Sequence, residues 1–168
     1  FQQDQFSVEL QLSGSSVEDR LSWVVGVYAF EEDGENINPV DFTTVSIQSG
    51  GYFDYSSEAV FAQATFDFTG KLSATAGIRY TKEDRDYLPD QYIQEMPLGG
   101  LPFPCFNADG STKVCALGDR VVPLETVNNS ISESTPMVSV SYSLTDDVML
   151  YGTYSEGFKV GGFTQRIF

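Results

Sequence analysis

The stretch KLSATAGIRYT, residues 71–81, alternates apolar and polar side chains over almost its whole length. Its even positions hold leucine, alanine, isoleucine and tyrosine, whereas its odd positions from 73 onward hold serine, threonine, glycine and arginine. Successive side chains of a β-strand point to opposite faces, so the stretch predicts a strand with one apolar face. The stretch FSVELQLS, residues 6–13, repeats the pattern with Phe6, Val8, Leu10 and Leu12 on one side.

Six segments carry this pattern, and they are long for strands. An ordinary globular strand has about 5–6 residues, whereas a strand that crosses a bilayer needs roughly 9–11. Short links join the segments in pairs, and long polar stretches at residues 31–57 and 82–133 separate the pairs. This arrangement is typical of an all-β, antiparallel up-and-down transmembrane β-barrel with short periplasmic turns and, here, two long extracellular loops. The predicted strands cover residues 5–13, 20–30, 58–68, 71–81, 135–144 and 148–155.

The same pattern predicts several finer features. We expect a short strand at residues 42–48 inside the first loop, and a tight turn at Thr69-Gly70 because glycine accepts a positive φ. Tyr28, Phe30 and Tyr80 fall near the long loops, where an aromatic girdle meets the membrane surface.

Composition narrows the classes of function. The chain has 168 residues, a net charge of −15 and no histidine. Residues 31–58 contain seven acidic side chains and no basic one, and residues 82–133 contain nine acidic and four basic ones. Acidity confined to loops is expected if the strands lie in lipid and the loops in water. Nucleic acid is not an expected partner of such a chain, because a phosphate binder carries a basic patch.

No constellation of an enzyme is visible, so we assign no catalytic residue. The chain offers no histidine for base catalysis, no nucleophile elbow and no phosphate-binding glycine loop. The acidic run EEDGEN, residues 31–36, has the oxygen ligands that calcium prefers. Its spacing fits no complete calcium loop, and a solvated acidic segment is the better interpretation. We therefore expect neither a metal site nor a cofactor.

Cys105 and Cys115 are the two cysteines of the chain, and both lie in the second long polar stretch. A protein exported through an oxidising periplasm would join them in a disulfide, whereas a cytosolic protein would keep two free thiols. Two cysteines without histidine make an incomplete zinc set.

The ends of the sequence lead us to expect an internal piece of a longer chain. It opens within or just before a strand, shows no signal peptide and stops after a glycine-rich segment. The missing signal then says nothing about destination. Six strands are also too few to close an outer-membrane barrel, since the known ones begin at about eight.

Three segments resemble TonB-dependent outer-membrane receptors, and they occur in the order in which that family carries them. RLSWVVGVYAFEE, residues 20–32, is similar to an early barrel strand of these receptors, and residues 59–87 are similar to their following hairpin. TDDVMLYGTYSEGFKVGGF, residues 145–163, resembles a strand that leads into a glycine-rich stretch of the family. The matching residues of that stretch are Tyr154, Gly157, Phe158, Lys159, Gly161, Gly162 and Phe163.

The resemblance implies a barrel of about 22 strands filled by an N-terminal plug domain. Residues 1–168 would then form a single incomplete domain from the middle of the barrel, without the plug or the closing strands. The implied location is the outer membrane of a bacterium, with lipid around the barrel and the TonB energy-coupling complex acting through the plug. The implied ligand is a small scarce nutrient of the ferric siderophore, haem, cobalamin or glycan class.

Two groups of residues are candidates for the ligand path, each with a structural alternative. Tyr52, Phe53 and Tyr55 form an aromatic cluster that suits a sugar or siderophore ring, or that packs the loop and anchors it at the membrane surface. The second group offers glycines for close backbone approach and a lysine for an anion, or marks a bend of the sheet. It comprises Gly157, Phe158, Lys159, Gly161 and Gly162.

Arg79 is a third candidate, because the alternation places it on the polar side that would line the lumen. Glu9, Gln63, Thr65 and Asp67 share that side, where polar groups usually bond to the plug or to water. Alternation alone also fits a soluble or surface-attached β-sandwich that binds or adheres, and it fits a passive porin.

Overall fold

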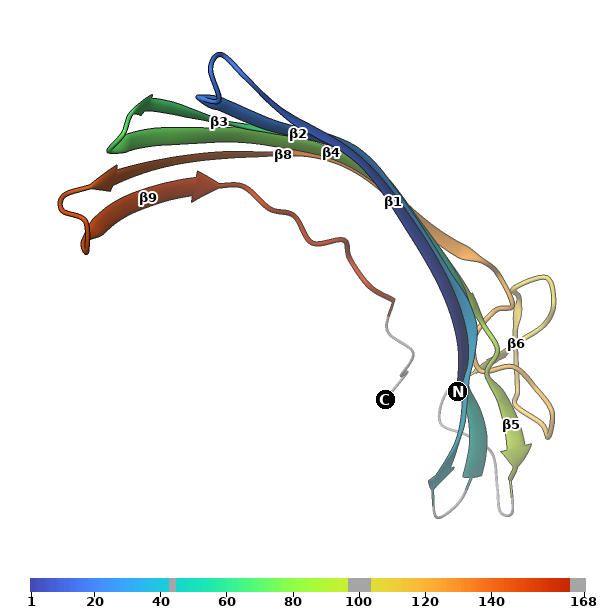
Figure 1. Ribbon diagram of the computed structural model, residues 1–168. Helices are drawn as coiled ribbons and strands as arrows, with labels where there is room; N and C mark the ends of the chain where they lie inside the picture. Colours follow the sequence, from blue (N-terminus) through green and yellow to red (C-terminus); the bar gives the residue numbers. More distant parts are fainter. Residues whose placement is uncertain (43–44, 97–103, 164–168) are drawn as a thin grey trace.

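The computed structural model describes residues 1–42, 45–96 and 104–163, and within these ranges it contains strands and no helix. Six long strands form one antiparallel sheet in the order β1-β2-β3-β4-β8-β9, with the short strand β5 paired to β3 (Figure 1). The prediction of an all-β antiparallel fold is confirmed. The long strands are β1 (Gln2–Ser16), β2 (Leu21–Phe42), β3 (Val45–Thr69), β4 (Leu72–Pro89), β8 (Val127–Ser143) and β9 (Met149–Ser155).

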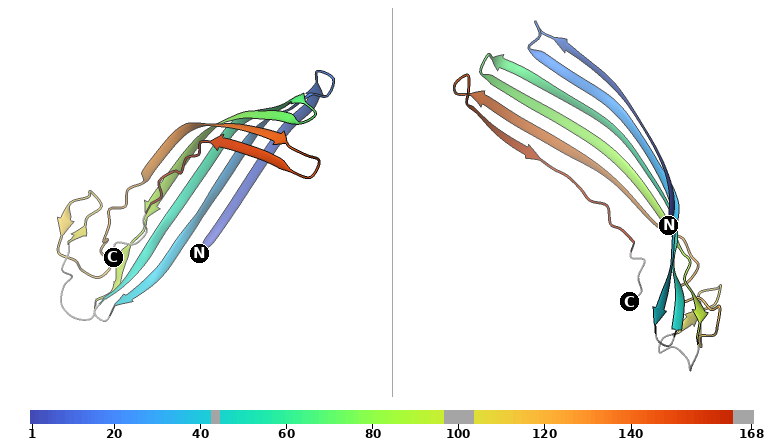
Figure 2. Two further views of the ribbon diagram at one scale, coloured as in Figure 1. Left: turned by 90° about the vertical axis from the view of Figure 1, so that its left-hand side faces the viewer. Right: turned by 60° about the horizontal axis from the view of Figure 1, so that its bottom comes forward.

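The sheet is curved and open, and its two ends differ (Figures 1 and 2). Short turns at residues 17–20, 70–71 and 144–148 lie at one end, which we call the turn end. The opposite end, here called the loop end, carries the extended β2–β3 hairpin and the long β4–β8 connection. Both views show the turns gathered together and the strands running side by side between the two ends.

Thr69 holds the β3–β4 turn, and the positive φ expected at Gly70 is wrong. The Thr69 Oγ1 accepts hydrogen bonds from the backbone N–H groups of Lys71, at 3.2 Å, and Leu72, at 3.1 Å. In the described residues the positive-φ glycines are Gly50, Gly110 and Gly118. A side-chain oxygen that caps backbone donors fixes the turn without the left-handed conformation.

Continuous register gives the sheet two chemically distinct faces. Val25, Ala62 and Ile78 occupy paired positions on β2, β3 and β4, and Leu10 on β1 belongs to the same side. We call this the apolar face; Leu10 is 67% exposed on it and Ile78 is 55% exposed. The odd positions of β4, Arg79 among them, form the opposite, polar face. An extended band of exposed apolar side chains needs a partner surface, because water does not favour it.

The first long loop expected from the sequence is instead a hairpin of strand. β2 and β3 pair without interruption from Leu21↔Phe66 to Phe42↔Val45. The loop expected over residues 31–57 and the separate strand expected at 42–48 are therefore wrong, and residues 43–44 lie outside the described residues. The alternation fades here because both faces carry acidic and polar groups, but the backbone ladder needs no apolar face to continue.

The described part of the second long connection, between β4 and β8, folds into a small unit, which we call the loop-end unit. It contains β5 (Tyr92–Glu95), β6 (Cys105–Phe106) and β7 (Thr112–Lys113), which the sequence did not predict. The Cys105 and Cys115 sulfurs are 2.08 Å apart, at the distance of a disulfide. Buried side chains from this unit and from the start of β3 form an apolar cluster: Val45, Ile47, Ile93, Cys105, Cys115 and Val121.

The loop-end unit is tied to the sheet by polar bonds as well. Arg120 Nη1 lies 2.7 Å from Asp90 Oδ1, just beyond the end of β4. The Asp90 N–H donates to the Gly50 carbonyl at 2.9 Å, and the Val121 N–H donates to the Gln91 carbonyl at 3.1 Å. The unit therefore packs against the loop end of the sheet, at the start of β3.

No helix long and apolar enough to span a bilayer occurs in the part of the chain that the structure describes.

Candidate functional site

Arg79 stands at the centre of a cluster on the polar face, which we call the middle cluster: Tyr28, Phe61, Arg79 and Thr81. The guanidinium carbon lies 5.2 Å from the centroid of the Tyr28 ring and 5.6 Å from that of Phe61. Nε donates to Thr81 Oγ1 at 3.1 Å. A cation against two ring faces is a favourable and well-oriented arrangement. The cluster borders a hollow of about 400 Å³ whose lining includes Thr135 and Phe158.

Glycines make room for the aromatic rings of this face. Gly26 on β2 pairs directly with Phe61 on β3, and a Cβ at Gly26 would overlap that ring and lie 2.9 Å from the Leu10 carbonyl oxygen. Gly34 stands in the same relation to Phe53, whose ring crosses it. An aromatic ring that lies over a glycine of the neighbouring strand is held in place by that contact.

Gly26→Ala is therefore expected to destabilise the full-length protein by about 1–3 kcal/mol, because the added methyl group overpacks the sheet and displaces Phe61. Thermal unfolding in detergent measures the effect. Gly77→Ala is the matched control on the same face, because the nearest atoms to its Cβ lie at 3.4 Å. Equal stability of the two variants would contradict the close packing described for Gly26.

A second group lies on the same face nearer the loop end, and we call it the loop-end cluster: Phe53, Tyr55, Glu83, Arg85 and Tyr87. The Phe53 and Tyr55 rings have centroids 5.2 Å apart, and the Arg85 guanidinium carbon is 5.3 Å from the Tyr55 centroid. Arg85 Nη2 also pairs with Glu83 Oε2 at 2.9 Å. Burial raises the pKa of the Tyr55 hydroxyl against the opposing effect of Arg85, so the phenol stays neutral and able to donate.

The segment that follows β9 lies over these clusters. Phe158 is half-buried beside the middle cluster, and Phe163 stacks on Tyr87 with the ring centroids 5.7 Å apart. Lys159 is exposed, and Val160 is buried. A Cβ at Gly157 or Gly162 meets open space, so neither of these glycines marks a close backbone approach. A Cβ at Gly161 would lie 3.5 Å from Asn129 Nδ2.

The aromatic triad proposed from the sequence is divided between the two faces. Phe53 and Tyr55 belong to the loop-end cluster, whereas Tyr52 is on the opposite side and 43% exposed. The triad was expected on a loop, but all three residues lie within β3. Gln63, Thr65 and Glu9 do lie on the polar face with Arg79, as their register shows.

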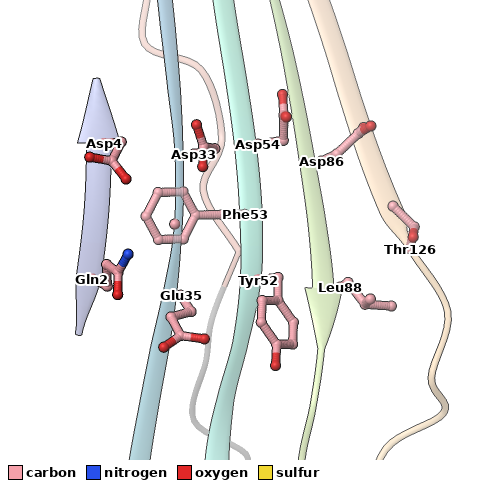
Figure 3. A pocket seen from close by; sticks show the side chains of 11 residues that line it. Gln2, Asp4, Asp33, Glu35, Tyr52, Phe53, Asp54, Asp86, Leu88 and Thr126 are labelled. Carbon is pink, nitrogen blue, oxygen red and sulfur yellow. The ribbon is translucent and has the colours of Figure 1, made fainter. Parts of the chain in front are cut away.

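Tyr52 borders an acidic surface on the apolar side of the sheet, close to the loop end (Figure 3). Asp4, Asp33, Asp54 and Asp86 occupy paired positions across four neighbouring strands. Directly opposed like charges destabilise a sheet, so these carboxylates are suited to a position in water. No set of residues in the described ranges is arranged to hold a metal ion.

Sequence reasoning missed the roles of Tyr28, Phe61, Arg85 and Tyr87. Tyr28 and Phe30 were expected in a membrane girdle, but the register places them on the polar face, so that expectation is wrong. Tyr80 does lie on the apolar face, 47% exposed. No alternation of apolar and polar residues marked Arg85 and Tyr87, because residues 82–86 are all charged and both faces of β4 are polar there.

Comparisons with known proteins agree with this geometry. Residues 1–168 match the family model described as "TonB dependent receptor-like, beta-barrel". The crystal structure of the ferric yersiniabactin uptake receptor FyuA from Yersinia pestis is similar with a TM-score of 0.66 at 16% identity, a level that shows the fold alone. The similarity covers 90% of this chain and 20% of that receptor chain. No curated protein sequence matches the chain.

Proposed function

Because the chain belongs to the family of TonB-dependent receptor-like β-barrels, we propose that it forms part of the wall of an outer-membrane receptor for active nutrient uptake. The observation that carries the proposal is the division of one curved sheet into an exposed apolar band and an aromatic, charged opposite face. Such a sheet is stable when lipid covers the band and the other face lines a lumen.

In this proposal the turn end faces the periplasm and the loop end faces outward. Residues 1–168 form an incomplete barrel, and a plug domain elsewhere in the full-length protein couples ligand release to the TonB complex. This part of the chain forms wall and rim of the proposed barrel, and we assign it no catalytic role.

The proposed ligand is a nutrient that carries rings or anionic groups, with a ferric siderophore as the first choice. The rings of both clusters and the Arg85 guanidinium suit such a ligand, since aromatic stacking and cation contacts recognise flat, conjugated molecules. The receptor FyuA, similar in fold, is itself named for uptake of ferric yersiniabactin. Haem, cobalamin and glycans are the other classes to be tried.

The test uses the full-length protein, purified in detergent and screened for a rise in unfolding temperature. The probes are ferric siderophores of several chemical classes, haem, cobalamin and oligosaccharides. Saturable stabilisation by one probe, together with loss of its uptake when the cellular TonB protein is deleted, is the expected result. Uptake that persists without TonB would favour a passive porin and reject an energised receptor.

Tyr55→Ala is expected to weaken binding of that probe about 2- to 12-fold, because it removes a ring worth about 0.5–1.5 kcal/mol in stacking. Tyr52→Ala removes the same kind of side chain from the same strand but on the opposite face, and it should leave affinity unchanged. Titration calorimetry on both variants measures the difference. An equal loss in the two variants would place the ligand outside the polar face.

A further inference from the structure

Arg79 has no carboxylate partner within the part of the chain that the structure describes. Its side chain contacts the two rings of the middle cluster, and its Nε donates to the Thr81 hydroxyl. Its backbone carbonyl accepts a hydrogen bond from Thr135 Oγ1 at 3.3 Å. None of the ion pairs in the described residues includes it.

Three other cations of the sheet and its turns are bonded to carboxylate or carbonyl oxygens. Arg85 pairs with Glu83, and Lys82 pairs with Asp84 at 2.7 Å. Arg20 donates from Nε to the Asp67 carbonyl at 2.9 Å and from Nη2 to the Phe68 carbonyl at 2.7 Å. Arg79 differs from them because, within the described residues, its side chain is hydrogen-bonded through Nε alone, and Arg79 lines the hollow.

The position of Arg79 makes the lack of a carboxylate partner in the described residues unusual. Its neighbours along β4, Ile78 and Tyr80, lie on the exposed apolar face, so Arg79 sits at the level of the band proposed to contact lipid. A charge at membrane depth faces an interior and pairs there, because an unpaired half-buried ion is costly. The rings of Tyr28 and Phe61 pack beside the guanidinium without neutralising it.

We propose that Arg79 is an anchoring residue that binds a carboxylate side chain from a protein segment lodged against the polar face inside the barrel. The inference rests on the proposed function, which supplies that segment as the plug. A carboxylate matches the fork of a guanidinium, because two parallel N–H groups can bond its two oxygens. The hollow of about 400 Å³ beside Arg79 gives such a side chain room to enter.

A protein carboxylate is favoured over an anionic ligand because the ligand-free receptor also needs a partner for Arg79. Arg79 is half-buried at the level of the exposed apolar band, where an unpaired charge is costly. A ligand occupies the lumen only during uptake, whereas a segment lodged in the lumen is present throughout. A resident carboxylate would therefore neutralise Arg79 in the resting receptor.

The test is zero-length crosslinking of the full-length receptor without ligand. In the Arg79→Lys variant a water-soluble carbodiimide joins the new amine to a carboxylate in contact with it, and mass spectrometry identifies the linked peptides. The expected product joins position 79 to an aspartate or glutamate outside residues 1–168. Arg85→Lys is the matched control, because its lysine should be linked to Glu83 within the same strand.

Thr135→Lys is a second probe that retains Arg79, since Thr135 pairs with Arg79 in the register and lines the same hollow. It should be linked to the same outside carboxylate. The inference is overturned if the control forms while positions 79 and 135 stay unlinked or react only within residues 1–168. In a parallel reaction with an added carboxylate siderophore, linkage of position 79 to that molecule alone would also overturn the inference and identify a ligand contact.

The two possible failures are distinguishable. A full-length sequence without a domain to occupy the lumen would reject the proposed function itself. A receptor that has such a domain and takes up its nutrient, yet yields no link at either position, would reject only the role of Arg79.

Discussion

Ala62→Arg is expected to destabilise the full-length protein by about 2–4 kcal/mol, because in the proposed barrel it would place a cation on the lipid-facing side near the middle of the membrane. Ala62 lies on the central strand β3, in a row with Val25 and Ile78 on the apolar face. An arginine there must either lose its hydration in the hydrocarbon layer or distort the bilayer around it.

Gln63→Arg is the matched control, since Gln63 is the next residue of β3 and is exposed on the opposite face. It should change stability by no more than about 0.5 kcal/mol. Unfolding in lipid vesicles with guanidinium measures both variants. A soluble sandwich whose core holds Ala62 would also be destabilised by Ala62→Arg. Such a sandwich would fold without detergent, whereas the proposed barrel should aggregate without it.

Joint replacement of Cys105 and Cys115 by alanine is expected to destabilise the loop-end unit by about 2–3 kcal/mol. The covalent link closes a short loop, and its loss restores conformational entropy to the opened state of the unit. Ile93 and Val121, which share the buried cluster with the disulfide, would be exposed in that state. The β4–β8 connection should then be cleaved by protease at a higher rate.

The effect should be local, because β1, β8 and β9 make no contribution to this cluster. Limited proteolysis of the intact protein, followed by mass spectrometry of the cut sites, measures it. Lys113→Ala serves as the control, since it removes an ion pair with Asp119 at the surface and leaves the cysteines joined. Identical cleavage rates for the double alanine variant and the native protein would show that the disulfide does not hold the unit closed.

The sheet was predictable from sequence wherever one face had to be apolar. The strand from Leu72 to Thr81 alternates without a break, so its faces and its pairing partners could be assigned in advance. The hairpin over residues 31–57 could not, because strands in water need no apolar side and their only requirement is backbone pairing. Acidic composition was therefore mistaken for irregular structure.

The candidate site, too, was predictable only in part from the sequence. Arg79 was correctly placed on the polar face because it lies within an alternating strand. Its contact with Tyr28 depends on two registers, that of β2 with β3 and that of β3 with β4, and residue spacing within one strand does not contain that information. The loop-end unit was missed because its core joins β5 and β6 to the start of β3, again across long separations.

The pairing of large rings with glycines suggests how such walls change over evolutionary time. Phe61 covers Gly26, and Phe53 covers Gly34, in each case across one pair of neighbouring strands. A mutation that enlarges the glycine is tolerated only after the ring has become smaller. The two positions of each pair should therefore covary among relatives, and the order of their substitutions should be fixed.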